Sequence, residues 1–141
     1  MFRMPRKWIV GVAGCAAMLS AQAHHSFRAQ YDDTKPIGVT GYVTKIDWMN
    51  PHVYFYIDVV TGEGKTENWA FEMGPPHMLE QRGWKRNSLA IGDEIEVAGT
   101  RARDGSHSAN ARSVKLTASG KVLGTASSEG QTITAGEAPA R

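Results

Sequence analysis

The chain has 141 residues, with 16 lysines and arginines against 14 aspartates and glutamates. Arg3, Arg6 and Lys7 lie in a segment that we expect to be removed, which leaves 13 basic against 14 acidic residues and a formal net charge of −1. This balance gives no support to nucleic-acid binding or to an anionic-membrane footprint. The single cysteine, Cys15, lies in the same segment, so the remainder has no disulfide or thiol chemistry.

Residues 1–23 have the pattern of a cleaved signal peptide. Basic residues precede an uncharged apolar run, residues 8–19, and Ala21-Gln22-Ala23 is the small-x-small pattern that signal peptidase accepts. The run is too short for a comfortable membrane span, so we expect no integral span and a periplasmic or secreted protein, although an uncleaved anchor stays a weaker alternative. A second alternative is a lipoprotein attached through Cys15, because Val12-Ala13-Gly14-Cys15 resembles a lipobox.

Strand patterns dominate the rest of the chain. We expect strands at residues 37–48, 52–60, 66–73, 94–103 and 108–116, with a short sixth strand near 121–123. In the clearest one, Val53, Phe55, Ile57 and Val59 alternate with His52, Tyr54, Tyr56 and Asp58. The first set should therefore face the core and the second set should face outward.

One short helix interrupts the strands. Gly74-Pro75-Pro76 ends the third strand, and residues 76–82 suit a helix that Gly83 closes. Three strands, a helix and two strands is the order of an OB-fold, so the predicted class is all-β, a small five- to six-stranded OB-like Greek-key barrel. A general β-sandwich is the alternative. We assign residues 24–36 to an N-terminal arm, 37–123 to the barrel and 124–141 to a flexible tail rich in small residues.

Several stretches carry a resemblance to a known family. They are AHHSF after the signal, GYVTKIDWMNPHVYFYIDV, NWAFEMGPP, RGWKRNSL, GDEIEVAG and DGSHSANARSVKL. In this order, over residues 23–123, they resemble a family of small exported bacterial proteins that is catalogued only as a domain of unknown function. The resemblance implies a small exported β-barrel with no established activity, so no catalytic residue is carried over.

The histidines are the candidate metal ligands: His24, His25, His52, His77 and His107. An OB-fold binds ligands on the outer face of its second and third strands and in the flanking loops, where His52, His77 and His107 are expected. The arm can bring His24 and His25 to the same region. If cleavage follows Ala23, the amine and imidazole of His24 plus one more imidazole form an all-nitrogen set that suits Cu(II). Solvated, non-binding histidines are the alternative.

A second candidate site involves aromatic residues. Tyr54 and Tyr56 are expected on the outer face of the second strand, beside the loop that contains Trp48 and Asn50. Such a surface suits stacking against a glycan or a protein partner of the cell envelope. The alternative is that the tyrosines pack beneath the arm or the tail.

Two functions follow from these candidates. The first is an exported metal-binding protein, with copper as the metal. The second is a non-catalytic interaction module that binds an envelope protein or a glycan through the outer face of the second and third strands. The sequence lacks a Gly-x-Ser-x-Gly elbow, a phosphate-binding glycine loop and a His-Glu-x-x-His motif, so it favours a protein without catalytic residues. The sequence identifies neither the partner nor the oligomeric state.

Overall fold

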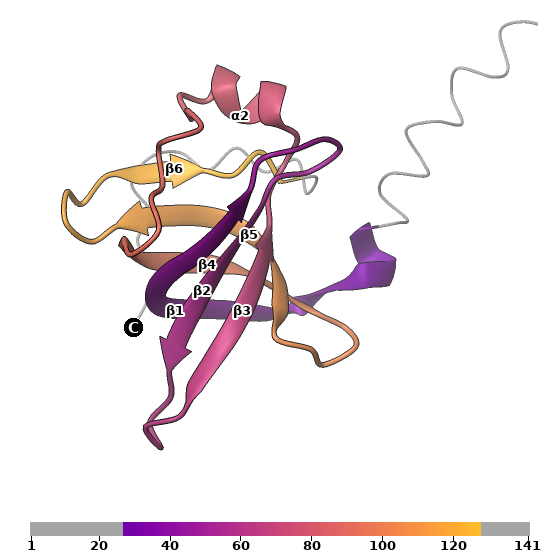
Figure 1. The fold of residues 1–141 in the computed structure, drawn as a ribbon. Coiled ribbons are helices and arrows are strands. Elements are labelled where there is room, and N and C mark those ends of the chain that lie inside the picture. The colour runs from indigo at the N-terminus through magenta and orange to yellow at the C-terminus, as the bar shows by residue number, and fades with distance from the viewer. Residues whose placement is uncertain (1–26, 128–141) are drawn as a thin grey trace, which may run out of the picture.

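The computed structural model describes residues 27–127 (Figure 1). The predictions for the signal peptide, His24, His25, Cys15 and the end of the tail lie outside these residues. After a helical turn at residues 27–30, the elements are β1 (Tyr31–Asp47), β2 (Tyr54–Val60), β3 (Thr66–Glu72), α2 (Pro76–Gln81), β4 (Glu94–Ala102), β5 (Ser108–Leu116) and β6 (Val122–Gly124). The all-β class is confirmed. The predicted start of the first strand, residue 37, is wrong, because β1 begins at Tyr31.

The strands are hydrogen-bonded in the order β3-β2-β1-β4-β5-β6, and each of these neighbours is antiparallel. One further pairing joins the two halves, since β3 runs parallel to β5 where Ala70, Phe71 and Glu72 face Ser108, Ala109 and Asn110. The pairings therefore form a closed circuit from β1 through β2, β3, β5 and β4 back to β1. Figure 1 shows that the long strand β1 is strongly curved, and it pairs with β2 on one side and with β4 on the other.

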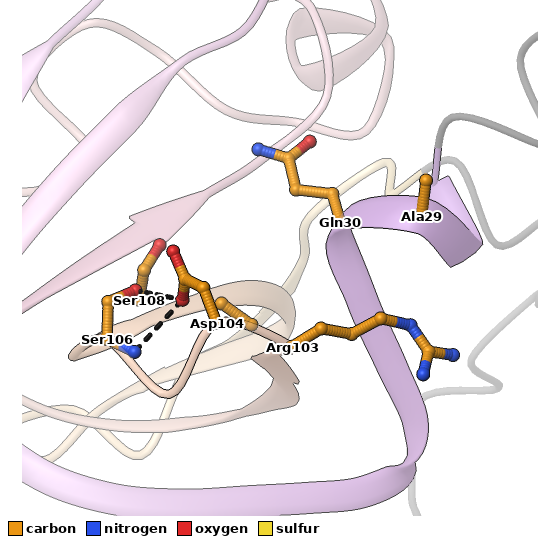
Figure 2. Close-up of a pocket in the computed structure, with 7 residues that line it drawn as sticks. Ala29, Gln30, Arg103, Asp104, Ser106 and Ser108 are labelled. Carbon is orange, nitrogen blue, oxygen red and sulfur yellow. Dashed lines mark hydrogen bonds between the residues drawn. The ribbon is translucent and has the colours of Figure 1, made fainter.

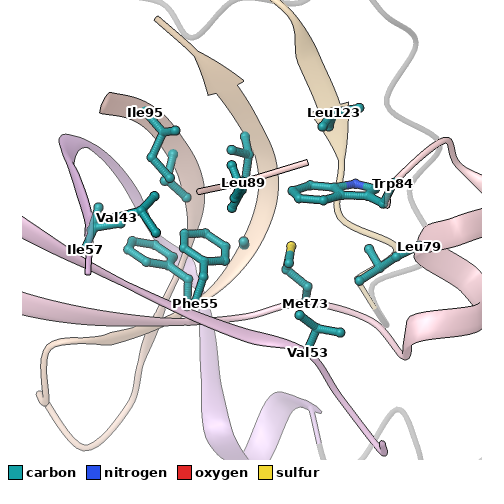
Figure 3. Close-up of a cluster of buried hydrophobic side chains, with 14 of the residues drawn as sticks. Val43, Val53, Phe55, Ile57, Met73, Leu79, Trp84, Leu89, Ile95 and Leu123 are labelled. Carbon is teal, nitrogen blue, oxygen red and sulfur yellow. The ribbon is translucent and has the colours of Figure 1, made fainter. Parts of the chain in front are cut away.

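The main core lies inside this circuit. Val53, Phe55 and Ile57 are fully buried, which confirms their predicted inward face. The ring of Phe55 stacks on Phe71 at a centroid distance of 5.3 Å. Figure 3 shows Phe55 and Ile57 grouped with Val43 of the neighbouring strand β1 and with Ile95 of β4, whereas Val53 lies beside Met73. The hydrophobic alternation of β2 thus accounts for one wall of the core.

Helix α2 and the segment after it close one end of the core. Leu79 is fully buried, and Trp84 beside it donates a hydrogen bond from Nε1 to the carbonyl of Gly124, at 2.8 Å (Figure 3). Gly83, which follows the helix, has φ +89°, a conformation that glycine adopts without strain.

The sequence analysis assigned residues 124–141 to a flexible tail, but residues 124–126 belong to the folded part. Gly124 belongs to β6, Thr125 and Ala126 are buried, and the Thr125 carbonyl accepts from the Gly74 amide at 2.9 Å. Within residues 27–127, no helix combines the length and apolar character needed to cross a membrane.

Candidate functional site

Glu72 is a carboxylate buried at the end of β3, with 5% of its surface exposed. It follows Phe71, which points into the core, so strand alternation places Glu72 on the opposite, outer face. A side chain on the outer face of β3 would be expected to be exposed to solvent. Glu72 is instead covered by Tyr31, the first residue of β1, which lies 41 positions earlier in the chain.

Three side chains converge on this carboxylate. The hydroxyls of Tyr31 and Tyr54 both donate to Oε2, at 2.5 and 2.8 Å. Nδ1 of His52 lies 2.6 Å from Oε1. An ionised carboxylate can only accept hydrogen bonds, so this arrangement puts a proton on Nδ1 of His52. We name Tyr31, His52, Tyr54 and Glu72 the Glu72 cluster.

The pairing of His52 Nδ1 with Glu72 leaves the other ring nitrogen, Nε2, on the side of the ring away from this carboxylate. In a neutral imidazole protonated at Nδ1, Nε2 carries the lone pair. Among the described residues no hydrogen-bond or ion-pair partner is found for this nitrogen, and 39% of the side chain is exposed. In its neutral form, His52 therefore offers an oriented nitrogen donor to a ligand arriving from solvent.

The two phenols are electrostatically suited to remain donors. Burial raises the pKa of Tyr31 far above its ordinary value of 10.0, and the hydrogen bond to Glu72 and the charge of that carboxylate raise it further. The pKa of Tyr54 is raised by the same causes in the same order. Both shifts arise because a phenolate here would be poorly solvated and would face a negative charge. The phenols therefore stay protonated and keep Oε2 of Glu72 in place.

Tyr31 also connects the cluster to the N-terminal part of the chain. Its ring packs against Phe27 at a centroid distance of 5.2 Å, and together with Ala102 these residues form a small apolar cluster separate from the main core. Arg103 holds the same segment: its amide donates to the Gln30 carbonyl at 3.0 Å, and its Nε donates to the Arg28 carbonyl at 2.6 Å.

An open cavity of about 570 Å³ lies between this segment and the β4–β5 connection. It is lined by Ala29, Gln30, Ala102, Arg103, Asp104, Ser106 and Ser108 (Figure 2). Oδ1 of Asp104 accepts from the amide and the hydroxyl of Ser106, so this carboxylate shapes the turn itself. Figure 2 shows the guanidinium of Arg103 directed away from this pair.

Neither His107 nor His77 has a recorded contact with the Glu72 cluster. The His107 ring stacks on Trp69 at 4.9 Å, and its Nε2 lies 3.5 Å from Glu67 Oε2. His77 lies in the first turn of α2. Within residues 27–127, no three histidine, cysteine, aspartate or glutamate side chains gather closely enough to hold a metal ion by themselves.

Of the predicted partner-binding residues, one belongs to the Glu72 cluster and the others lie outside it. Tyr54 is tied to Glu72, whereas the Tyr56 ring remains on the outer face with Lys45 Nζ 5.0 Å from its centroid. Trp48 is partly buried against the main core, and Asn50 is exposed before a cis bond to Pro51.

Sequence reasoning did not single out Glu72 or Tyr31 as site residues. One signal was available: in the β2–β3 register Tyr54 lies opposite Glu72, and His52 shares the face of Tyr54. An acid, a tyrosine and a histidine were thus neighbours on one face.

Comparisons with known proteins place the chain in a family without assigning it an activity. No curated protein and no solved structure is detectably similar to it. The model of a family of unknown function, DUF6152, matches residues 12–111, in agreement with the resemblance carried by the sequence motifs. Because this match covers most of the chain, the protein belongs to the DUF6152 family.

Proposed function

We propose that this protein is an exported metal-binding protein and that its metal is copper, held by His52 together with His24 and His25 of the N-terminal arm. The observation that carries the proposal is the 2.6 Å contact between Nδ1 of His52 and Oε1 of the buried Glu72. Metal-binding histidines commonly donate their second ring N–H to a carboxylate, which fixes the ring and raises its basicity. Of the three histidines in the described residues, only His52 is paired with a buried carboxylate.

The contacts of the arm support a site that His24 and His25 complete. Only Ser26 separates His25 from Phe27. Phe27 packs on Tyr31, Tyr31 donates to Glu72, and Glu72 contacts His52. A short chain of contacts therefore leads from the beginning of the described arm to the proposed ligand.

The donor set favours copper. Cleavage after Ala23 gives His24 a free amine beside its imidazole, and Nε2 of His52 supplies a third nitrogen. An all-nitrogen set of this kind suits Cu(II) in a planar arrangement. His25 is a further nitrogen donor, whereas the His107 ring stacks on Trp69 and its Nε2 lies 3.5 Å from Glu67 Oε2.

Export and the barrel are part of the same proposal. Export is supported by the signal-like pattern of residues 1–23. An OB-like Greek-key barrel is supported by the closed circuit of pairings and by α2 lying between β3 and β4.

The test combines the processed N-terminus with copper binding. The full-length chain is expressed with export to a bacterial periplasm, its intact mass is measured, and Cu(II) is titrated while the paramagnetic resonance spectrum is recorded. We expect a mass beginning at His24 and one stoichiometric site with nitrogen ligands. The site should be lost in His52→Ala and retained in His107→Ala. A lipidated mass, or weak copper binding without a defined stoichiometry, would overturn the proposal.

A second candidate function rests on the outer face of β1 and β2. Tyr42 is 51% exposed and pairs with Asp58, which shares its face with Tyr56. With Trp48 and Asn50 in the adjacent loop, this face suits stacking against a glycan of the envelope, or contact with an envelope protein. Co-sedimentation with purified envelope polysaccharide should detect binding that falls in Tyr42→Ala and Tyr56→Ala. Equal sedimentation of the variants and the unsubstituted protein would count against this candidate.

A further inference from the structure

We infer that the outer face of β2 and β3 binds a neutral oligosaccharide along one line, from Tyr56 over Ala70 to Ser108 and into the cavity beside Gln30. The site deepens the second candidate function, on which it rests, and it involves no metal. Its basis is that the register of the strands brings a partly exposed aromatic ring and a polar cavity onto one face of the sheet.

Three residues in lateral register form this line. Tyr56 pairs with Ala70 between β2 and β3, and Ala70 pairs with Ser108 where β3 runs parallel to β5. Each of the three is next in sequence to a fully buried core residue, so strand alternation turns all three side chains outward. Neighbouring strands lie about 4.8 Å apart, so the line from Tyr56 to Ser108 is about 10 Å long. We name it the Tyr56–Ser108 line.

The Tyr56 ring provides the stacking surface at one end of the line. Lys45 approaches this ring from β1, with Nζ 5.0 Å from the centroid, and the ammonium is itself paired with Asp47 at 2.6 Å. On the β3 side the neighbour of Tyr56 is Ala70, whose side chain is a single methyl group. The negative face of an aromatic ring attracts the C–H groups of a sugar, and the small Ala70 leaves room for a sugar ring beside Tyr56.

Fixed hydrogen-bond acceptors flank this end of the line. Asp58 and Asn68 face each other one position along β2 and β3, two residues from Tyr56 and Ala70. Nδ2 of Asn68 donates to Asp58 Oδ1 at 2.7 Å and to Thr44 Oγ1 at 3.2 Å. These bonds direct the amide hydrogens into the sheet, so the amide oxygen of Asn68 and the second oxygen of Asp58 are left as acceptors. Such acceptors suit a ligand that carries many hydroxyl donors.

The other end of the line opens into the cavity of about 570 Å³, which Ser108 lines. Figure 2 shows Gln30 of the arm and Asp104 and Ser106 of the β4–β5 connection around the same space. These side chains are an amide, two hydroxyls and a carboxylate, which together can donate and accept hydrogen bonds. The cavity therefore offers partners to a further sugar unit of a chain that starts at Tyr56.

The charges along the line favour a neutral chain. Carboxylates lie near both ends, Asp58 beside the stacking surface and Asp104 in the cavity. The ammonium of Lys45 is already paired, and Figure 2 shows the guanidinium of Arg103 directed away from Asp104. An anionic polymer would bring negative charge to these carboxylates, whereas sugar hydroxyls can donate to them. A neutral, hydroxyl-rich chain fits both the charges and the polar groups.

Calorimetric titration of the exported protein tests the class of ligand. The neutral probes are maltose, maltohexaose, diacetylchitobiose and chitohexaose, with hexagalacturonate as the anionic chain and hexalysine as the cationic one. We expect a neutral hexasaccharide to bind more tightly than its own disaccharide, because only the longer chain reaches the cavity. Tighter binding of hexagalacturonate or hexalysine than of every neutral hexasaccharide would overturn the assignment of a neutral ligand.

Variants at the two ends of the line test its course. Tyr56→Ala should weaken disaccharide and hexasaccharide binding about tenfold each. Gln30→Ala should weaken hexasaccharide binding about threefold and leave disaccharide binding unchanged. The Gln30 carbonyl still accepts from the Arg103 amide in this variant, so the arm stays attached. Arg28→Ala is the matched control on the arm, because the Arg28 side chain is 76% exposed and does not line the cavity.

Substitution at Ala70 tests the middle of the line. Ala70→Gln places a longer side chain between Tyr56 and Ser108 and should weaken hexasaccharide binding about tenfold. Ala70→Ser is nearly the same size as the original residue and should bind within about twofold of the unsubstituted protein. Amide NMR spectra show whether each variant is folded, and Gln30→Ala tests the line independently if Ala70→Gln is not.

The line and the second candidate function fail in different ways. Binding that falls in Tyr56→Ala but is unchanged in Gln30→Ala would confine the glycan to the face of β1 and β2 and overturn the line alone. Co-sedimentation with envelope polysaccharide without binding of any neutral hexasaccharide would also overturn the line, while the second candidate stands. Absence of both would overturn the two together.

Discussion

His52 and Glu72 are joined across the boundary between solvent and interior, with Nδ1 of the imidazole 2.6 Å from Oε1 of the carboxylate. The histidine is partly exposed, whereas the carboxylate is buried and also accepts hydrogen bonds from two tyrosines. A buried carboxylate with three donors is favourable only while all of them remain in place. Changes at Glu72 should therefore affect stability as well as binding.

Glu72→Gln tests this network directly. The amide keeps the shape of the side chain but replaces one acceptor with a donor, which then faces a group that also donates. We expect the free energy of unfolding to fall by about 2 kcal/mol, measured by urea denaturation. Glu96→Gln is the control, because Glu96 forms an exposed pair with Lys115, and its loss should be below about 1 kcal/mol. Equal losses in the two variants would contradict a special role for Glu72.

Alkaline pH should destabilise the protein through Tyr31 and Tyr54. Their pKa values are raised above the ordinary 10.0, so above that pH the phenols ionise in the unfolded chain while they stay protonated in the folded one. The stabilising contribution is complete below pH 10.0 and is lost as the pH rises toward the folded-state values.

Each phenol should lower the free energy of unfolding by up to about 1.4 kcal/mol per pH unit in that range. Denaturation curves at several alkaline pH values, with phenolate absorbance as a second signal, measure the slope. In Tyr31→Phe the fall in the free energy of unfolding per pH unit should be smaller, because only Tyr54 of the two phenols remains. A slope that is the same in both proteins would show that Tyr31 ionises normally in the folded state.

Local sequence patterns were sufficient where local contacts determine the structure. The alternation around Phe55 gave the inward face of β2, and the prolines before residue 77 and Gly83 after the helix bracket α2. The start of β1 was missed because residues 31–35 are mostly polar and show no alternation. Tyr31 joins the strand through its pairing with Ala102, a contact between residues distant in sequence that the local pattern does not contain.

The candidate site was predictable to a similar extent. His52 and Tyr54 were both identified, and the register between β2 and β3 brings Glu72 to them. The burial of Glu72 depends on Tyr31, which approaches from outside the hairpin. Strand alternation assigns a residue to a face, but it does not tell which distant segment covers that face.

Two glycines of β1 should respond differently to the same substitution. A Cβ on Gly41 would lie 2.5 Å from the carbonyl oxygen of Asp58 in the neighbouring strand, whereas a Cβ on Gly38 would meet no atom within 4 Å. Gly41→Ala should therefore push β1 and β2 apart and lower the free energy of unfolding by about 1–3 kcal/mol. Gly38→Ala should be neutral or stabilising by up to about 1 kcal/mol, because alanine restricts the unfolded chain. Similar losses in urea denaturation would show that the close approach at Gly41 is not limiting.

Trp84 and Trp48 allow a matched test of the end of the core that α2 closes. Trp84 is 2% exposed, and its Nε1 donates to the Gly124 carbonyl of β6 at 2.8 Å. Nε1 of Trp48 is buried, and among the described residues it has no hydrogen-bond partner. Trp84→Phe leaves a carbonyl without its donor, so we expect the free energy of unfolding to fall by about 1–3 kcal/mol. Trp48→Phe removes a donor that is already unpaired, which should offset part of the packing that the smaller ring loses.

Hydrogen exchange can localise the effect of Trp84. Because its indole joins the segment after α2 to β6, the amides that pair β6 with β5 should exchange faster in Trp84→Phe than in Trp48→Phe. If both variants lose the same stability, or if the β6 amides are equally protected in both, the indole contributes through its apolar surface alone.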